Sequence, residues 1–200
     1  MRALFLAALV AVIAGCASSP ISKPIETPAS KSLQQQHLNS IAAIKAFSLK
    51  GRIGVQTEGK GFSGSMQWQH ETAEDNIALY SPLGGQVASI KKDANAVTLT
   101  EGNGNSISAQ DAETLTEMTL GWKLPLTGLA DWSLGRPTAQ PIDKINWDEM
   151  GRITHLVQEG WDIEYSDYLA HEGKQLPNKI YLRSPKVNIK LIVENRFSTP

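Results

Sequence analysis

Apolar and polar residues alternate with a period of two over much of the chain. In the clearest case, Val187, Ile189, Leu191 and Val193 share one face and Asn188 lies on the other. This alternation is typical of strands that bury one face and expose the other. It predicts about ten short strands, over residues 47–55, 62–68, 77–80, 86–91, 96–100, 105–108, 153–158, 161–165, 179–183 and 187–193.

A helical period replaces the alternation in three places. Ser108 and Asp111 are spaced as a capping box at the start of the second predicted helix. Thr127 is the expected N-cap of the third helix, and Gly135 and Pro137 end it. The apolar stripes are Leu33, Leu38, Ile41 and Ile44 in the first helix, Ala112, Leu115 and Met118 in the second, and Leu129, Trp132 and Leu134 in the third.

The loops between most strands are as short as hairpin turns, with glycine-rich segments at residues 57–61 and 101–104. Consecutive strands joined in this way form an antiparallel sheet, and a sheet of about ten strands curls rather than staying flat. The sequence therefore predicts a mainly β fold, an antiparallel curled sheet that forms an open half-barrel covered by about three α-helices. Residues 33–200 form its single domain.

The first residues have the pattern of an export signal. An apolar run from Ala3 to Ala14 follows Arg2 and is too short to span a bilayer. It ends in the sequence IAGC, which resembles the lipobox of bacterial lipoproteins, with Ile13 where leucine is most common. The resemblance implies a signal peptide over residues 1–15 and lipidation of Cys16. The alternative is a secretory signal with an incidental cysteine.

Residues 16–32 are rich in serine and proline, and we expect them to form a flexible tether from the lipid to the domain. In bacterial lipoproteins an aspartate after the lipidated cysteine generally means retention in the inner membrane. Ala17 stands at that position. The expected location is therefore the outer membrane, with the domain facing the periplasm.

Composition and motifs favour no catalytic chemistry. The formal net charge is −1, which gives no long-range attraction for nucleic acid. Cys16 is the only cysteine, the four histidines have no metal-ligand spacing, and no G-x-S-x-G motif is present. We therefore expect neither an enzyme nor a protein that carries a metal or a cofactor.

Two stretches behind the lipobox carry a family resemblance. The first contains residues 66–70 (MQWQH) and 80–85 (YSPLGG), and the second runs from residues 121–126 (GWKLPL) to Pro137. Together they resemble the LolB family of outer-membrane lipoproteins. The resemblance implies an eleven-stranded half-barrel closed by three helices. It also implies a receptor whose hydrophobic cavity accepts acylated lipoproteins from the periplasmic carrier LolA and which inserts them into the outer membrane. We expect the protein to be a monomer.

A leucine stands at the centre of a tight polar turn. Pro82 fixes its φ angle and the two glycines permit positive φ, so Leu83 is expected to project outward. The alternative is that Leu83 folds back onto the core. The family resemblance favours a protruding loop that contacts the membrane, made of Ser81, Pro82, Leu83, Gly84 and Gly85.

Large apolar residues on the inner faces could line an acyl cavity or simply form the core. The cavity candidates are Ile53, Val55, Met66, Trp68, Leu115, Met118, Trp122, Leu129, Trp132 and Trp161.

The cationic residues leave several alternatives open. Arg52 either faces solvent, the favoured alternative, or binds carbonyl groups at the C-terminus of a covering helix. Lys91, Lys92 and Lys186 are candidates for a patch that docks the carrier.

Two functions compete with the receptor. A structural or adaptor lipoprotein would have the same anchor and sheet, with its interior filled by its own side chains. An outer-membrane hydrolase is the weaker alternative.

Overall fold

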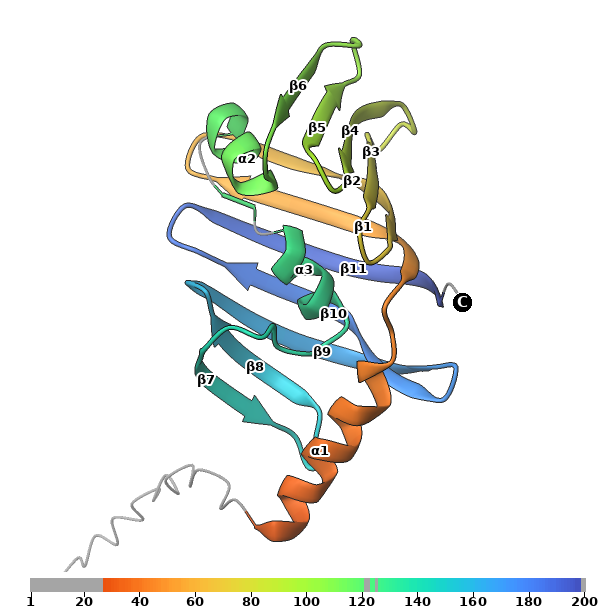
Figure 1. Cartoon of the computed structure of the whole chain (residues 1–200), viewed down its shortest axis with the longest axis vertical. Helices are drawn as coiled ribbons and strands as arrows, with labels where there is room; N and C mark the ends of the chain where they lie inside the picture. Colours follow the sequence, from red (N-terminus) through yellow and green to blue (C-terminus); the bar gives the residue numbers. More distant parts are fainter. Residues whose placement is uncertain (1–26, 121–122, 125, 199–200) are drawn as a thin grey trace, which may run out of the picture.

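The computed structural model describes residues 27–120, 123–124 and 126–198. Its centre is a sheet of eleven antiparallel strands in the order β6-β5-β4-β3-β2-β1-β11-β10-β9-β8-β7 (Figure 1). The first and last strands pair in the middle of the sheet, so β6 and β7 form its two edges. The strands are β1 (Phe47–Thr57), β2 (Gly61–His70), β3 (Asp75–Tyr80), β4 (Gln86–Lys92), β5 (Val97–Glu101), β6 (Ser106–Ala109), β7 (Ile142–Trp147), β8 (Ile153–Gln158), β9 (Trp161–His171), β10 (Lys174–Arg183) and β11 (Val187–Ser198).

All ten strands predicted from the alternation are present, and the sheet is open and antiparallel as expected. The prediction missed β7. This edge strand is interrupted by register shifts near both ends, and most of its side chains are exposed. Because a bulge breaks the period of two, β7 carries no continuous alternation to detect.

Three helices lie on one face of the sheet: α1 (Pro28–Ala42), α2 (Ala112–Leu120) and α3 (Leu126–Ser133) (Figure 1). The first begins before the predicted Leu33, because Thr27 and Ser30 form a capping box and Pro28 occupies the first turn. Residues 28–32 are therefore helical, although the tether was predicted to extend to residue 32.

The predicted cap of α2 was also wrong. Ser108 lies in β6 and pairs through its hydroxyl with Thr98. Asp111 itself caps the helix, since its carboxylate accepts a hydrogen bond from the Thr114 backbone N–H at 2.7 Å. The same bond, followed by one from the Thr114 side chain, lowers the pKa of Asp111.

The inner face of the sheet carries the core. In the half formed by β8–β10, α3 packs tightly on the sheet, and the Trp132 and Trp161 rings lie 6.3 Å apart. The Trp132 indole N–H donates to the buried Gln158 amide at 3.1 Å. This half of the interior is therefore filled by the protein's own side chains.

Among the described residues, none of the helices has both the length and the apolar character needed to cross a bilayer.

Candidate functional site: an apolar cavity under helix α2

A cavity of about 420 Å³ lies between the inner face of β1–β5 and helix α2. Most of its lining residues are apolar. They come from strands β1–β5 and β11, from helices α2 and α3, and from two loop positions, Lys60 and Leu124. The lining consists of Ile53, Val55, Thr57, Lys60, Gly61, Phe62, Met66, Ile77, Leu79, Val87, Ala88, Ile90, Leu99, Glu101, Thr116, Thr119, Leu124, Leu129 and Ile189.

The strand register explains why these residues meet. Met66 pairs with Leu79, Leu79 with Ala88, and Ala88 with Glu101, so one inward row crosses four strands. A second row runs from Trp68 through Ile77, Ile90 and Leu99. Because side chains opposite each other in antiparallel strands share a face, each hairpin extends the same apolar surface.

Helix α2 presents mainly apolar atoms to this surface. The Thr116 and Thr119 hydroxyls donate to the carbonyls of Ala112 and Leu115, both at 2.8 Å. The Thr116 hydroxyl also accepts a hydrogen bond from the Leu124 backbone N–H. Their hydrogen-bonding capacity is thus used within the helix and its following turn, and the threonine methyls remain for the cavity.

Charged residues mark one end of the cavity. Lys60, beside the β1–β2 turn, and Glu101, at the end of β5, are both exposed lining residues. The β3–β4 turn lies at the same end of the sheet, because antiparallel hairpins place alternate turns on one side. The cavity therefore has a polar rim next to the turn that carries Leu83.

The turn has the tight geometry predicted for it. The Ser81 backbone N–H donates to the Gly85 carbonyl at 2.8 Å, and the Gly84 N–H donates to the Ser81 carbonyl at 2.9 Å. Gly84 has φ of +88°, a conformation that favours glycine. Leu83 is 98% exposed, so the alternative in which it folds back onto the core is wrong.

Of the ten cavity candidates, Ile53, Val55, Met66 and Leu129 line this cavity. The remaining described candidates do not. Both Met118 and Leu115 belong to α2. Met118 points away from the cavity and is 71% exposed, whereas Leu115 is fully buried. The other buried candidates are Trp68, Trp132 and Trp161. Trp122 and Cys16 lie outside the described residues.

Trp68 belongs to a polar cluster instead. Its indole N–H donates to the buried Asp75 carboxylate at 2.8 Å, and His70 contacts the same oxygen at 2.7 Å. Lys92 reaches the other oxygen at 3.4 Å. Burial alone would raise the pKa of Asp75, but the bonds from His70 and Trp68, together with the charges of His70 and Lys92, lower it overall. Lys92 is thus committed to an internal ion pair.

Sequence reasoning missed most of the lining, including Phe62, Leu79, Ala88, Ile90 and Leu99. Met66 and Trp68 face inward, and the residues paired with them across each predicted hairpin must face inward too. Following this rule from strand to strand would have identified the lining residues of β3–β5. Ala88 gives no hydrophobic signal of its own, because a small residue contributes to a cavity by the space it leaves.

Two arginines fix the helices next to the cavity. The Arg136 guanidinium donates to the Ile41 and Ile44 carbonyls, at 2.8 and 3.0 Å, at the C-terminal end of α1 and just beyond it. It also pairs with Asp131 of α3 at 2.7 Å. Arg196 of β11 donates to the Ser133 carbonyl at 2.8 Å, and burial lowers its pKa to about 10.

These arginines bind helix carbonyls in the way that was considered for Arg52. Arg52 itself faces solvent, as favoured, and pairs with Glu194 at 2.8 Å.

Helix α1 is also fixed at its middle. His37 is buried against the Tyr168 ring, and the guanidinium of Arg152 stacks on that ring while pairing with Asp148. Burial lowers the pKa of His37, and the charge of Arg152 acts in the same direction while Asp148 opposes it. Gly151 allows α1 to approach closely, since a Cβ there would lie 2.4 Å from the Leu33 carbonyl carbon.

The described part of the chain contains no group of three or more His, Cys, Asp or Glu side chains that could hold a metal ion. The site therefore consists of an apolar cavity, a polar rim and an exposed leucine.

Known proteins of one family are similar to this chain. A family model described as outer membrane lipoprotein LolB matches residues 45–195. The outer-membrane lipoprotein LolB of Thiobacillus denitrificans is 37% identical over 155 residues, covering 78% of this chain and 82% of the relative. That of Nitrosomonas europaea is 33% identical over 189 residues, covering 93% and 88%.

The fold is shared more widely. The crystal structure of a LolA superfamily protein from Nitrosomonas europaea superposes with a TM-score of 0.51 at 9% identity, covering 86% of this chain and 94% of the other. The matching family model spans more than half of the chain, and both relatives exceed 30% identity over most of their length. The chain therefore belongs to the LolB family of outer-membrane lipoproteins.

Proposed function

We propose that this protein is a monomeric receptor, anchored in the outer membrane through lipidated Cys16, that accepts acylated lipoproteins from the periplasmic carrier LolA. The observation that carries the proposal is the apolar cavity under α2, which opens beside the exposed Leu83 turn. In the structural or adaptor alternative, side chains would fill the interior. They do so around Trp132 and Trp161, but not beneath α2.

The energetics of acyl chains favour direct transfer. A chain of ~15 methylenes costs about 12 kcal/mol to expose to water, at ~0.8 kcal/mol for each methylene. Release into the periplasm is therefore negligible, and the cargo passes from the carrier's cavity to this one without entering water. A cavity that binds chains more tightly than the carrier, and less tightly than a bilayer, makes transfer downhill.

Entry of a chain requires part of the covering layer to move, and α2 is the element we assign to this role. Arg136 and Arg196 tie α1 and α3 to the rest of the fold. In contrast, the hydrogen bonds of the α2 threonines stay within the helix and its following turn. Thr116 and Thr119 are the α2 residues that line the cavity, and an acyl chain would take the space beside them, so we assign the opening to α2.

Leu83 would act at the last step. Inserting one leucine into a bilayer contributes about 1.5–3 kcal/mol, which is too weak to anchor the protein but sufficient to perturb lipid packing at the mouth of the cavity. We therefore assign Leu83 to release of the cargo rather than to its uptake.

The test uses the full lipidated chain in vesicles, mixed with LolA that carries a triacylated lipoprotein. We expect cargo to move into the vesicles without added energy. Leu83→Glu should leave cargo uptake intact and slow insertion at least tenfold, because burial of one leucine is worth about 1.5–3 kcal/mol.

The matched control is Leu169→Glu on β9, where the leucine is 56% exposed and lies toward the opposite end of the sheet. Equal insertion rates for the Leu83 variant and the parent would overturn the role of this turn. Absence of any transfer with a folded parent would favour the adaptor alternative.

A further inference from the structure

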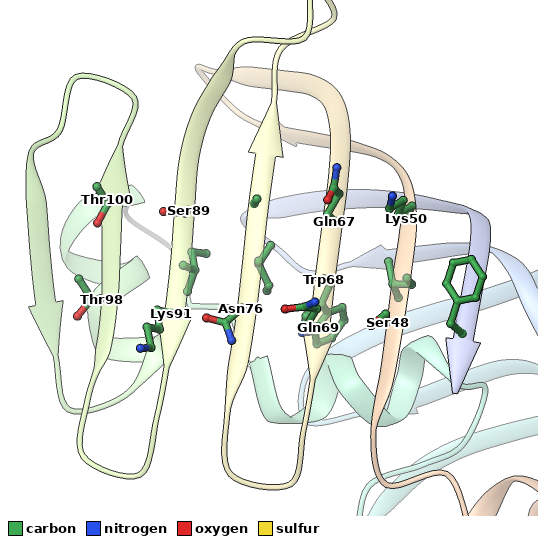
Figure 2. A pocket seen from close by; sticks show the side chains of 15 residues that line it. Ser48, Lys50, Gln67, Trp68, Gln69, Asn76, Ser89, Lys91, Thr98 and Thr100 are labelled. Carbon is green, nitrogen blue, oxygen red and sulfur yellow. The ribbon is translucent and has the colours of Figure 1, made fainter. Parts of the chain in front are cut away.

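The outer face of β1–β5, which faces away from the helices, carries a hollow of about 550 Å³ (Figure 2). We call it the outer hollow. Two rows of outward side chains cross its strands in register. The first row is Phe197, Ser48, Gln69, Asn76, Lys91 and Thr98, and the second is Lys50, Gln67, Ala78, Ser89 and Thr100. Figure 2 shows the polar members on this face, with helices behind the sheet.

The polar groups of the outer hollow are not used by the protein itself. Among the described residues, the side chains of Lys50, Gln67, Gln69, Asn76 and Lys91 form no hydrogen bond or ion pair with one another or with other groups. The hydroxyls at the β5–β6 edge differ, because Thr98 and Thr100 each bond to a serine of β6 at 2.8 Å. Three amides and two ammonium groups therefore face solvent side by side.

In the other half of the sheet, the charged side chains of the outer face form ion pairs with one another. Arg183 of β10 pairs with Glu164 and Asp162 of β9, and Lys179 pairs with Asp167. Opposite charges on neighbouring strands thus compensate each other there. The residues that line the outer hollow include two lysines and no carboxylate. Backbone hydrogen bonds and then the charge of Lys91 lower the pKa of Asp93, a carboxyl outside this lining, but the two side chains form no ion pair. A carboxylate from outside the protein would pair directly with Lys50 and Lys91.

We propose that the outer hollow binds a cell-wall glycan strand, a linear chain of N-acetylated sugars that also carries carboxylates. Glutamine and asparagine amides both donate and accept, which matches N-acetyl groups and sugar hydroxyls. Lys50 and Lys91 match the carboxylates. Phe197, which is exposed and lies beside Ser48 at one end of the first row, offers an aromatic face to a sugar ring.

The dimensions suit a strand rather than a single sugar. Six strands from β11 to β5 span about 24 Å at a spacing of ~4.8 Å, which accommodates several pyranose units. A protein partner is disfavoured, because stable protein interfaces centre on buried aromatic and aliphatic residues. Phe197 is the one exposed large apolar side chain in this lining. Acyl cargo and glycan would occupy opposite faces of the same sheet, so the proposal is independent of the receptor function.

The test measures binding to the full lipidated chain in detergent micelles by isothermal titration calorimetry. The probes are cell-wall glycan fragments freed of their stem peptides, chitotetraose as an N-acetylated glycan without carboxylates, and polyglutamate as an acidic peptide. We expect saturable binding of the wall fragments that weakens with salt, at least tenfold weaker binding of chitotetraose, and no binding of polyglutamate.

Three variants locate the site. Ala78→Trp places a bulky side chain between Gln67 and Ser89 and should reduce wall-glycan affinity at least tenfold. The double variant K50Q/K91Q should reduce it at least fivefold and flatten its salt dependence. The matched control K144Q/K186Q removes two exposed lysines outside the outer hollow and should bind like the parent.

No binding of the wall fragments, or binding that Ala78→Trp leaves unchanged, would overturn the proposal. Equal affinity for chitotetraose would remove the role of the lysines. Tight binding of polyglutamate with the same response to Ala78→Trp would identify the outer hollow as a docking surface for an acidic protein instead.

Discussion

The role of the inner cavity in binding acyl chains can be tested by filling the cavity with a larger side chain of the protein itself. Ala88 of β4 lines the cavity between Leu79 of β3 and Glu101 of β5. Ala88→Trp points a large ring into existing space, so the free energy of unfolding should change by less than ~1.5 kcal/mol. The fold is then preserved while the space available to an acyl chain shrinks.

The expected effect on binding follows from the area involved. A buried tryptophan covers about 150–250 Å², of which roughly half, ~100 Å², would face the guest chain. At ~25 cal/mol for each Å² of apolar surface, the guest loses about 2.5 kcal/mol of burial. We therefore expect roughly fifty- to a hundredfold weaker binding, since ~1.4 kcal/mol corresponds to a factor of ten.

The assay is displacement of a fluorescent fatty acid, followed by capture of a lipoprotein from loaded LolA. Ala78→Trp is the matched control, because it introduces the same side chain on the neighbouring strand but on the opposite face of the sheet. Full binding of the fatty acid by Ala88→Trp would refute the assignment of this cavity, as would an equal loss in both variants.

Two further predictions concern the fixed helices. Arg136→Ala should lower the free energy of unfolding by about 3 kcal/mol in urea titration, because charge-assisted hydrogen bonds contribute ~1.5–3 kcal/mol each. Arg52→Ala, which removes one exposed ion pair, should cost under ~1 kcal/mol, and equal losses would contradict the anchoring role of Arg136. His37 has a lowered pKa in the folded state, so the unfolded chain binds more protons, and stability should fall as the pH drops below its ordinary pKa of 6.5. The urea midpoint should decrease between pH 7.5 and pH 5, and His37→Gln should reduce that decrease, whereas an unchanged pH response would show that His37 is not its source.

The sheet was predictable from the sequence because most of its strands bury one face continuously. The four inward residues of β11, from Val187 to Val193, are all buried as their alternation predicts. Strand β7 escaped detection because its bulges break the period. The start of α1 was placed too late, since a serine- and proline-rich composition conceals the capping box formed by Thr27 and Ser30.

The cavity was only partly predictable, for a physical reason. Hydrophobicity identifies residues that avoid water, but it does not distinguish a side chain beside a void from one packed against neighbours. Trp132 and Met66 both lie on the apolar faces of their predicted elements. In the structure, Trp132 fills the core under α3 while Met66 lines the cavity under α2. The turn at Leu83 was predictable because proline and glycine determine its backbone locally.

The two halves of the sheet differ in how they are packed, and this difference explains how a rigid domain can contain a cavity that opens. The half under α3 is packed around Trp132 and Trp161 and is tied through Arg136 to α1, which leads toward the proposed lipid anchor. The half under α2 holds the cavity, and the turn with Leu83 lies at its rim. The cavity leaves part of the inner surface beneath α2 without packed side chains, and local opening costs less free energy where packing is incomplete. Opening confined to α2 would expose acyl-binding surface next to the membrane, while the packed half keeps the domain folded and attached.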